Sequence, residues 1–309
     1  MTGLRYLDVC AGISASSVAW KPLGWEAAAY SEIEAAPRAV LEHRQGALPV
    51  GWDHLHVAGS NTTPLFGDFT QIEAHHVGPI DLLVGGTPCQ DFSISGLRAG
   101  LDGDRGNLSL EFLRLADRTR PRWVVWENVP GVLSIDEGRA FGAILGGMGE
   151  LGYGAAYRVL DAVHFGSASF RRRVFIVGYL GDWRPSAAAL VERQSMSGHS
   201  STVRGRLRGI GKDRLGCLSA KGAAYDRQDL DVLIYDYDNL TVRRPTVLEC
   251  ERAMGFPDDY TLVPHRGKPM ADGPRYKALG NSMAVPVMRW IGERIDAVEA
   301  LQYEKRDAA

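Results

Sequence analysis

The sequence lacks the signals of several protein classes. Its four cysteines, Cys10, Cys89, Cys217 and Cys250, are scattered without a Cys-x-x-Cys pair, which argues against a disulfide framework and against a zinc site. No apolar run reaches about 18 residues, and the N-terminus carries no basic region followed by a hydrophobic core. Internal repeats and low-complexity tracts are also absent. We therefore expect a protein of a reducing cytosol, with no membrane attachment and no metal.

A strong excess of one charge is missing as well, although charge is unevenly distributed along the chain. The 309 residues include 35 Lys and Arg and 37 Asp and Glu, a formal net charge of -2, so the whole chain gives no sign of a polyanion partner. Between Arg171 and Arg214, however, ten basic residues stand against three acidic ones. Such a run is commonly a solvated surface, but a flank that faces phosphates is an equally good interpretation.

The strongest local signal is the stretch at 81–93. Leu82 to Val84 are typical of a buried strand, and Gly85 and Gly86 then end the strand and let the backbone come close to a ligand. Cys89 therefore lies where a strand opens into a loop, and in an open α/β sheet this edge is where ligands bind. The competing interpretation is a packed cysteine, because free Cys is among the most buried residue types.

Other predicted strands also end in polar residues. The strand at 4–9 is followed by a turn of small residues and a helical pattern, an arrangement that cradles a nucleotide against a helix N-terminus. About twenty residues later Glu32 ends a second strand, where a carboxylate hydrogen-bonds ribose hydroxyls. Asp68 and Phe69 close a third strand, the Asp able to accept from an exocyclic amine and the Phe able to pack on a ring. Glu127 directly follows a further apolar strand.

The remaining chain predicts a lid and a second domain. The loop at 92–107 is long, rich in glycine and without a clear period, which is typical of a lid. From 179 to 242 the pattern loosens into short segments rich in Arg, Gly and Ser. Further elements are predicted as helices at 138–149, at 247–254 and before Val298, and as strands at 157–160 and 174–178. Alternation directs Arg171 and Arg173 to the same side.

Taken in order, these stretches resemble the DNA (cytosine-5)-methyltransferase family. The first of the motifs and the compact middle of the chain also resemble the family's phage and prophage members. The matching motifs are Gly-Gly-Thr-Pro-Cys-Gln at 85–90, Glu-Asn-Val at 127–129, the Arg triplet at 171–173, the stretch 244–257 and Gly-Asn-Ser at 280–282. The resemblance implies an α/β, Rossmann-like S-adenosylmethionine-dependent methyltransferase fold with a second, smaller target recognition domain. The expected division is a catalytic domain at 1–178, the recognition domain at 179–274 and a return to the catalytic domain at 275–309.

The resemblance also implies the catalytic residues. Cytosine C5 is too electron-poor to take a methyl group directly, so the Cys89 thiolate first adds to C6 and makes C5 nucleophilic. Glu127 binds the N3 and N4 edge, Arg173 approaches O2 and Arg171 supports the pocket. Because this chemistry cannot occur inside a stacked duplex, the base is flipped out, and the loop at 92–107 is the expected clamp.

The implied cofactor is S-adenosyl-L-methionine, which leaves as S-adenosyl-L-homocysteine. The residues expected to bind it are Asp8, Cys10, Ala11, Gly12, Ile13, Ser14, Glu32, Ile33, Asp68, Phe69, Pro88, Leu108, Asn281 and Ser282. The chain departs from the family pattern at three places: Cys10 replaces an aromatic residue, Ser14 and Ala15 replace a glycine pair, and Ser169 replaces a glutamine. None of these changes removes a reacting group. The changes at Cys10, Ser14 and Ala15, however, can lower cofactor affinity or alter the choice of methyl donor.

The expected partner is double-stranded DNA with a short recognition sequence, read by the arginines of 179–242. A monomer is expected, without an obligate protein partner, in the cytoplasm of a bacterium or of a phage-infected cell. Cys217 and Cys250 are expected to be structural. Three alternatives remain open: an RNA cytosine-5 methyltransferase on the same scaffold, a catalytically silent DNA-binding protein of this fold, and an enzyme that uses an altered sulfonium donor.

Overall fold

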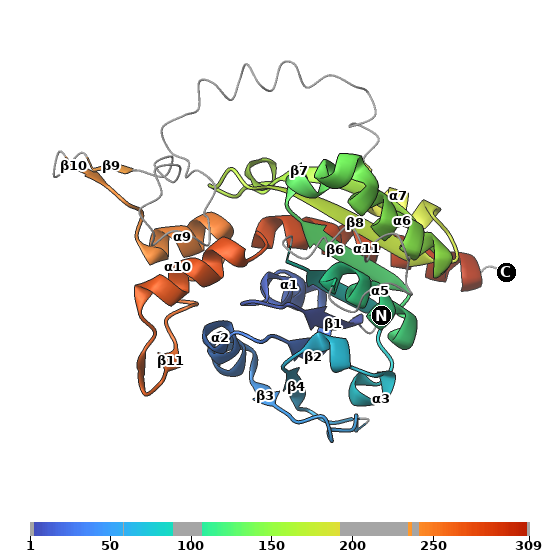
Figure 1. Ribbon diagram of the computed structural model, residues 1–309, viewed down its shortest axis with the longest axis horizontal. Helices are drawn as coiled ribbons and strands as arrows, with labels where there is room; N and C mark the ends of the chain where they lie inside the picture. Colours follow the sequence, from blue (N-terminus) through green and yellow to red (C-terminus); the bar gives the residue numbers. More distant parts are fainter. Residues whose placement is uncertain (1–2, 58, 89–106, 192–233, 237–240, 308–309) are drawn as a thin grey trace, which may run out of the picture.

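The structure is a computed structural model that describes residues 3–57, 59–88, 107–191, 234–236 and 241–307 (Figure 1). Cys89, Cys217, nearly all of the expected lid at 92–107 and most of the basic segment lie outside the described residues. The predictions made for them stay predictions. No helix within the described ranges is long and apolar enough to cross a membrane.

The described chain is built on one eight-stranded sheet. Its order is β3-β4-β2-β1-β5-β6-β8-β7, and Figure 1 shows the strands fanning across the molecule from β3 at one end to β7 at the other. The bounds are β1 Arg5–Val9, β2 Glu26–Ser31, β3 Ala47–Pro49, β4 Thr63–Phe66, β5 Leu82–Gly86, β6 Trp123–Asn128, β7 Tyr153–Asp161 and β8 Arg172–Leu180. Strands β1 to β6 pair in parallel, whereas β8 is antiparallel to both β6 and β7.

Helices cover both faces of the sheet because the strands are apolar on both sides. Along β5, Leu82 and Val84 join one core with side chains of α1, α7, α9 and α11, while Leu83 joins a second core with side chains of α5 and α6. The helices are α1 Ala15–Trp20, α2 Ala35–Gln45, α3 Ala74–Val77, α5 Leu108–Thr119, α6 Arg139–Glu150, α7 Arg184–Leu190, α9 Val247–Met254, α10 Asp272–Asn281 and α11 Val285–Asp307. The period-two alternation thus fixes which helix each strand residue meets.

Shorter elements complete the described chain. The 3-10 turns are η1 Lys21–Leu23, η2 Phe69–Gln71, η5 Pro130–Leu133, η6 Ile135–Gly138 and η7 Ala162–Phe165, and two small antiparallel pairs join β9 Ile234–Asp236 to β10 Thr241–Arg243 and β11 Pro264–His265 to β12 Lys268–Pro269. Helix α9 begins at a capping box formed by Thr246 and Glu249, and ends at Gly255 with φ 82°.

The predicted α/β, Rossmann-like fold is confirmed. Strands β2 to β4 lie on one side of β1, and β5 and the later strands lie on the other, so the strand order reverses between β1 and β5. Ligands bind outside the carboxyl ends of the strands at such a switch point. The proposed domain division is not marked by a change of core in the described residues. Leu190 of α7 and Met254 of α9 both lie in the core that contains Leu82.

Candidate active site

A buried ion pair lies at the carboxyl end of β6. Nε of Arg173 lies 3.1 Å from Oε1 of Glu127, and Glu127 is 8% exposed. The antiparallel register pairs Glu127 with Phe175, so the beginning of β8 reaches the end of β6. Burial raises the pKa of Glu127, while the charges of Arg173 and then Arg171 lower it. The structure therefore brings together the three residues that the sequence singled out here, and favours a carboxyl group that can carry a proton.

Two glycines of β5 make room for this site. Gly86 pairs with Glu127 across the parallel ladder, and a Cβ added at Gly86 would lie 2.8 Å from Oε2 of Glu127. A Cβ added at Gly85 would lie 2.7 Å from the carbonyl oxygen of Val9. Both glycines thus lie too close to other protein atoms for a larger residue, Gly86 to the Glu127 carboxylate and Gly85 to strand β1, while the predicted approach to a ligand stays a prediction.

A hydrogen-bonded chain holds the residues that precede Cys89. Trp126 Nε1 donates to Thr87 Oγ1 at 2.9 Å, and this oxygen lies 2.7 Å from Ser109 Oγ at the start of α5. Asn128 Nδ2 donates to the carbonyl of Thr87 at 2.9 Å. Thr87 is therefore fastened to β6 and α5 two residues before the predicted nucleophile. The sequence analysis did not identify Thr87, Trp126 or Ser109, although polar groups at the end of a buried strand were a usable signal.

The turn at 10–14, between β1 and α1, is held by two carboxylates. Gly12 N donates to Glu32 Oε2 at 2.8 Å, and Glu34 N donates to Glu32 Oε1 at 2.8 Å. On the other side Ser14 Oγ donates to Asp8 Oδ2 at 2.7 Å. Cys10, Gly12 and Ser14 all have positive φ, at 49°, 55° and 51°, which strains a non-glycine residue. The bond to Asp8 helps to hold Ser14 in a conformation that the family's glycine adopts freely.

Asp8 is the centre of a buried polar network and does not line open space. It is 2% exposed and also accepts a hydrogen bond from Ser16 Oγ. Burial raises the pKa of Asp8 to about 7, against the lowering effect of the two serines. Ser17 Oγ extends the network to the hydroxyls of Tyr6, at 2.9 Å, and Tyr30, at 2.8 Å. Asp8 thus supports the turn from beneath.

The other residues expected at the cofactor differ in accessibility. Ile33 is 74% exposed, and Pro88 and Asn281 are exposed. Cys10, Ala11, Gly12, Asp68 and Leu108 are partly covered, whereas Ile13, Ser14, Phe69 and Ser282 are buried. Two of these side chains have structural partners, because Asp68 Oδ1 accepts from Thr70 N at 3.0 Å and Ser282 Oγ donates to the carbonyl of Met283 at 3.1 Å.

Phe69 lies mostly in the core. Its ring is 4% exposed and packs in the cluster that contains Ile72 and Val77. Asp68 caps η2, and the short 3-10 turn carries Phe69 into the sheet's second core. The cofactor contact expected of Phe69 stays a prediction, and the ring has little exposed area to offer for it.

The residues present fit a nucleoside cofactor. A Cβ added at Gly12 or at Gly67 would meet no described heavy atom within 4 Å, so both positions border open space. Glu32 is oriented by two backbone N–H groups and keeps lone pairs for ribose hydroxyls. Within the described ranges no cluster of His, Cys, Asp or Glu side chains could hold a metal ion.

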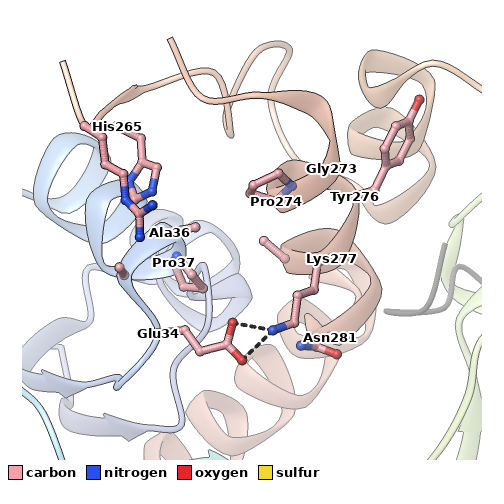
Figure 2. A pocket seen from close by; sticks show the side chains of 12 residues that line it. Glu34, Ala36, Pro37, His265, Gly273, Pro274, Tyr276, Lys277 and Asn281 are labelled. Atoms are coloured by element: carbon pink, nitrogen blue, oxygen red, sulfur yellow. Dashed lines mark hydrogen bonds and ion pairs between the residues drawn. The ribbon is translucent and has the colours of Figure 1, made fainter. Parts of the chain in front are cut away.

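A pocket of about 420 Å³ lies between the start of α2 and helix α10. Figure 2 shows Lys277 reaching across to Glu34, whose two carboxylate oxygens each lie 2.8 Å from Nζ, with Asn281 beside them. The first turn of α2 and the β11–β12 hairpin close the opposite wall. Asn281, a predicted cofactor residue, thus lies on one wall of this cavity. The opposite wall begins at Glu34, two residues after Glu32.

Comparisons with known proteins agree with this geometry. The family model of the C-5 cytosine-specific DNA methylases matches residues 4–231 and 219–297. A protein of Escherichia phage P1 named as a DNA N-6-adenine-methyltransferase is 30% identical over 98% of this chain and 62% of its own length. The type II methyltransferase M.HhaI of Haemophilus parahaemolyticus is 25% identical over 96% of this chain and 95% of its own. The DNMT2 crystal structure from Spodoptera frugiperda has a TM-score of 0.67 and 16% identity, covering 95% of this chain and all of that one.

Since the family model covers most of the chain, the protein belongs to the C-5 cytosine-specific DNA methylase family. Its fold is that of the Rossmann-like methyltransferases. The chain spans 62% of the length of the phage relative, so that protein has a large part with no counterpart here.

Proposed function

We propose that this protein transfers a methyl group from S-adenosyl-L-methionine to C5 of a cytosine in a short DNA sequence, through a covalent bond between Cys89 and cytosine C6. The observation that carries the proposal is the buried pair of Glu127 and Arg173, which lies beside the strand that leads into Cys89. A carboxyl group and a guanidinium in this arrangement offer hydrogen bonds to the polar edge of a single flipped base.

Cys89 and Glu127 carry the addition step. The Cys89 thiolate forms a bond to C6, and the electrons of the C5–C6 bond move to C5 as Glu127 protonates or holds N3. The raised pKa of Glu127 favours the protonated carboxyl that this role needs. Bound S-adenosylmethionine supplies an electrophilic methyl group. After C5 has taken the methyl, the C5 proton leaves to a base, the C6–S bond breaks and Cys89 returns as a thiolate.

The residues around the pair complete the proposed site. Arg173 is directed to cytosine O2, while Arg171, 2% exposed, supports the pocket from inside. Glu32 and the turn at 10–14 hold the ribose and methionine parts of the cofactor, and Asn281 closes the site from α10. The basic segment at 179–242 contacts DNA. We propose that the protein acts as a monomer on double-stranded DNA in the cytoplasm of a bacterium or of a phage-infected cell, as its phage and bacterial relatives suggest.

The name of the phage relative favours a second candidate activity, methylation of adenine N6. An exocyclic amine needs no covalent activation by a thiol, so this reaction would leave Cys89 without a role. The two activities therefore predict opposite outcomes for a Cys89 variant.

The test is incubation of the protein with radiolabelled S-adenosylmethionine and mixed-sequence duplex DNA, followed by separation of the nucleosides. The parallel samples are Cys89→Ala protein and an RNA substrate. We expect label in 5-methylcytosine of DNA alone, and none with Cys89→Ala. Label in N6-methyladenine that survives Cys89→Ala would overturn the proposal, and label confined to RNA would reassign the substrate.

A second measurement traps the proposed covalent bond. In DNA with 5-fluorocytosine, the fluorine at C5 cannot leave as a proton does, so elimination stops and the Cys89–C6 bond persists. We expect a protein–DNA band that survives denaturation, requires S-adenosylmethionine and is lost with Cys89→Ala. DNA binding without transfer or trapping would favour a silent binding protein or an altered donor.

A further inference from the structure

The turn at 10–14 receives a hydrogen bond from a distant part of the chain. The hydroxyl of Tyr260 donates to the carbonyl oxygen of Ile13 at 3.0 Å. Tyr260 lies after α9, in the segment that follows Gly255, Phe256 and Pro257. A residue three positions beyond the motif at 244–257 thus contacts the turn between β1 and α1.

This bond acts beside two others that hold the neighbouring residues of the turn. Gly12 is bound through its N–H to Glu32 at the end of β2, and Ser14 through its hydroxyl to Asp8 in β1. Ile13, between them, has a buried side chain, and its carbonyl oxygen accepts the hydrogen bond of Tyr260. Each of these three hydrogen bonds comes from a different part of the chain, and each contributes to the shape of the turn.

Tyr260 is itself fixed in place. It is 5% exposed, and Gln45 Nε2 donates to its hydroxyl at 2.8 Å, which directs the hydroxyl's own proton toward Ile13. Arg44 Nε donates to the carbonyl of Tyr260 at 2.8 Å, and the Phe256 ring lies 4.9 Å from the Tyr260 ring. Burial raises the pKa of Tyr260, so the hydroxyl stays a donor.

We infer that Tyr260 is a positioning residue for the cofactor, acting through the carbonyl of Ile13 and joining the segment after the recognition region to the cofactor turn. The inference rests on the proposed function. Tyr260 reaches the ligand only through the turn, so its effect falls on cofactor affinity. Tyr260 takes no part in the ion pair of Glu127 and Arg173, so those two side chains are expected to keep their positions without it.

The test compares Tyr260→Phe with Tyr153→Phe. Tyr153 is a matched control, because its buried hydroxyl also donates to a backbone carbonyl, that of Pro121 at 2.6 Å, at the far end of the sheet. Losing one such bond in Tyr260→Phe is expected to weaken S-adenosylhomocysteine binding by about threefold to tenfold in calorimetry and to raise the KM for S-adenosylmethionine equally. The kcat at saturating cofactor and the KM for DNA should stay within about twofold of wild type.

The control separates positioning from stability. Both variants are expected to lower Tm by similar amounts, but only Tyr260→Phe changes cofactor affinity. Equal cofactor affinity in the two variants, or a loss of kcat without a change in KM, would overturn the inference while wild-type methylation stood. Wild-type protein that binds S-adenosylhomocysteine but methylates no DNA would instead reject the proposed function. Wild-type protein that binds no S-adenosylhomocysteine would reject both.

Discussion

Oε1 of Glu127 lies 3.1 Å from Nε of Arg173, across two antiparallel strands and with both side chains largely covered. Neither side chain is well solvated, so the attraction between the two groups offsets part of the cost of burying them. Burial raises the pKa of Glu127, whereas the positive charges of Arg173 and Arg171 lower it. Burial has the larger effect, which leaves Glu127 easier to protonate than an exposed glutamate.

Replacing Glu127 with Gln keeps the shape of the side chain but removes its exchangeable acid proton. We expect single-turnover methylation of DNA to fall by about a hundredfold or more, the usual effect of losing a general acid. Glu150→Gln is the control, since Glu150 is exposed at the end of α6. A Glu127→Gln rate within about threefold of wild type would contradict the role given to this carboxyl.

Gly86→Ala tests whether the carboxylate needs the space above β5. The added Cβ would lie 2.8 Å from Oε2 of Glu127, which is the free end of a side chain and can move away. We therefore expect the fold to persist and kcat to fall about tenfold or more, because Glu127 is displaced from its position. Gly131→Ala provides the comparison, because a Cβ there meets nothing within 4 Å. Equal activity of the two variants would show that the contact is harmless.

Asp8→Asn tests the buried charge beneath the cofactor turn. The folded-state pKa of about 7 lies above the ordinary aspartate pKa of 3.8. Between these two pH values the folded protein therefore holds a proton that the unfolded chain has released. Asp8 therefore costs stability progressively as pH rises from about 4 to 7, on the order of 4 kcal/mol at most, and nothing further above 7. Urea unfolding at pH 5 to 8 should show wild type losing stability relative to Asp8→Asn as pH rises. A constant difference would contradict the shift.

Substitutions of Thr87 test whether its hydroxyl group, rather than its volume, stabilises the folded protein. Thr87→Val keeps the shape but leaves the Trp126 indole N–H buried without its acceptor, which we expect to lower the free energy of unfolding by about 1–3 kcal/mol. Thr87→Ser retains the oxygen and should remain within about 1 kcal/mol of wild type. Thr119→Val removes a hydroxyl that bonds only within helix α5, and it serves as the control. Equal losses for Val and Ser at position 87 would refute the hydrogen-bond explanation.

The strands and the class of fold could be predicted from the sequence, because the apolar runs in β1, β5 and β6 end where polar residues begin. The direction of β8 could not, since the alternation of side chains is the same for a parallel and an antiparallel strand. Glu127 and Arg173 were placed together by the order of motifs, and the structure agrees. The burial of the Phe69 ring could not be predicted, because an aromatic residue after a strand looks the same in sequence whether it faces a ligand or the core.

Other parts of the site depend on contacts that no local pattern reveals. The hydroxyl of Tyr260 meets a backbone carbonyl 247 positions away, and that oxygen has no signature in the sequence. Asp8 was expected near the cofactor from its place at the end of β1, but two serines of the following helix cover it. Local sequence shows which groups are polar, whereas the partner of each one is decided by the packing of distant segments.

The reversed direction of β8 decides which kinds of residue can share one edge of the sheet. Six parallel strands deliver only their last residues there, each followed by a loop that evolution can lengthen or replace. The antiparallel strand delivers its first residues instead, so Arg173 is anchored by the whole strand that follows it, deep in the sheet. A guanidinium at the start of a continuous strand is held more rigidly than one carried on a loop, so its position depends little on the length or sequence of the loops around it.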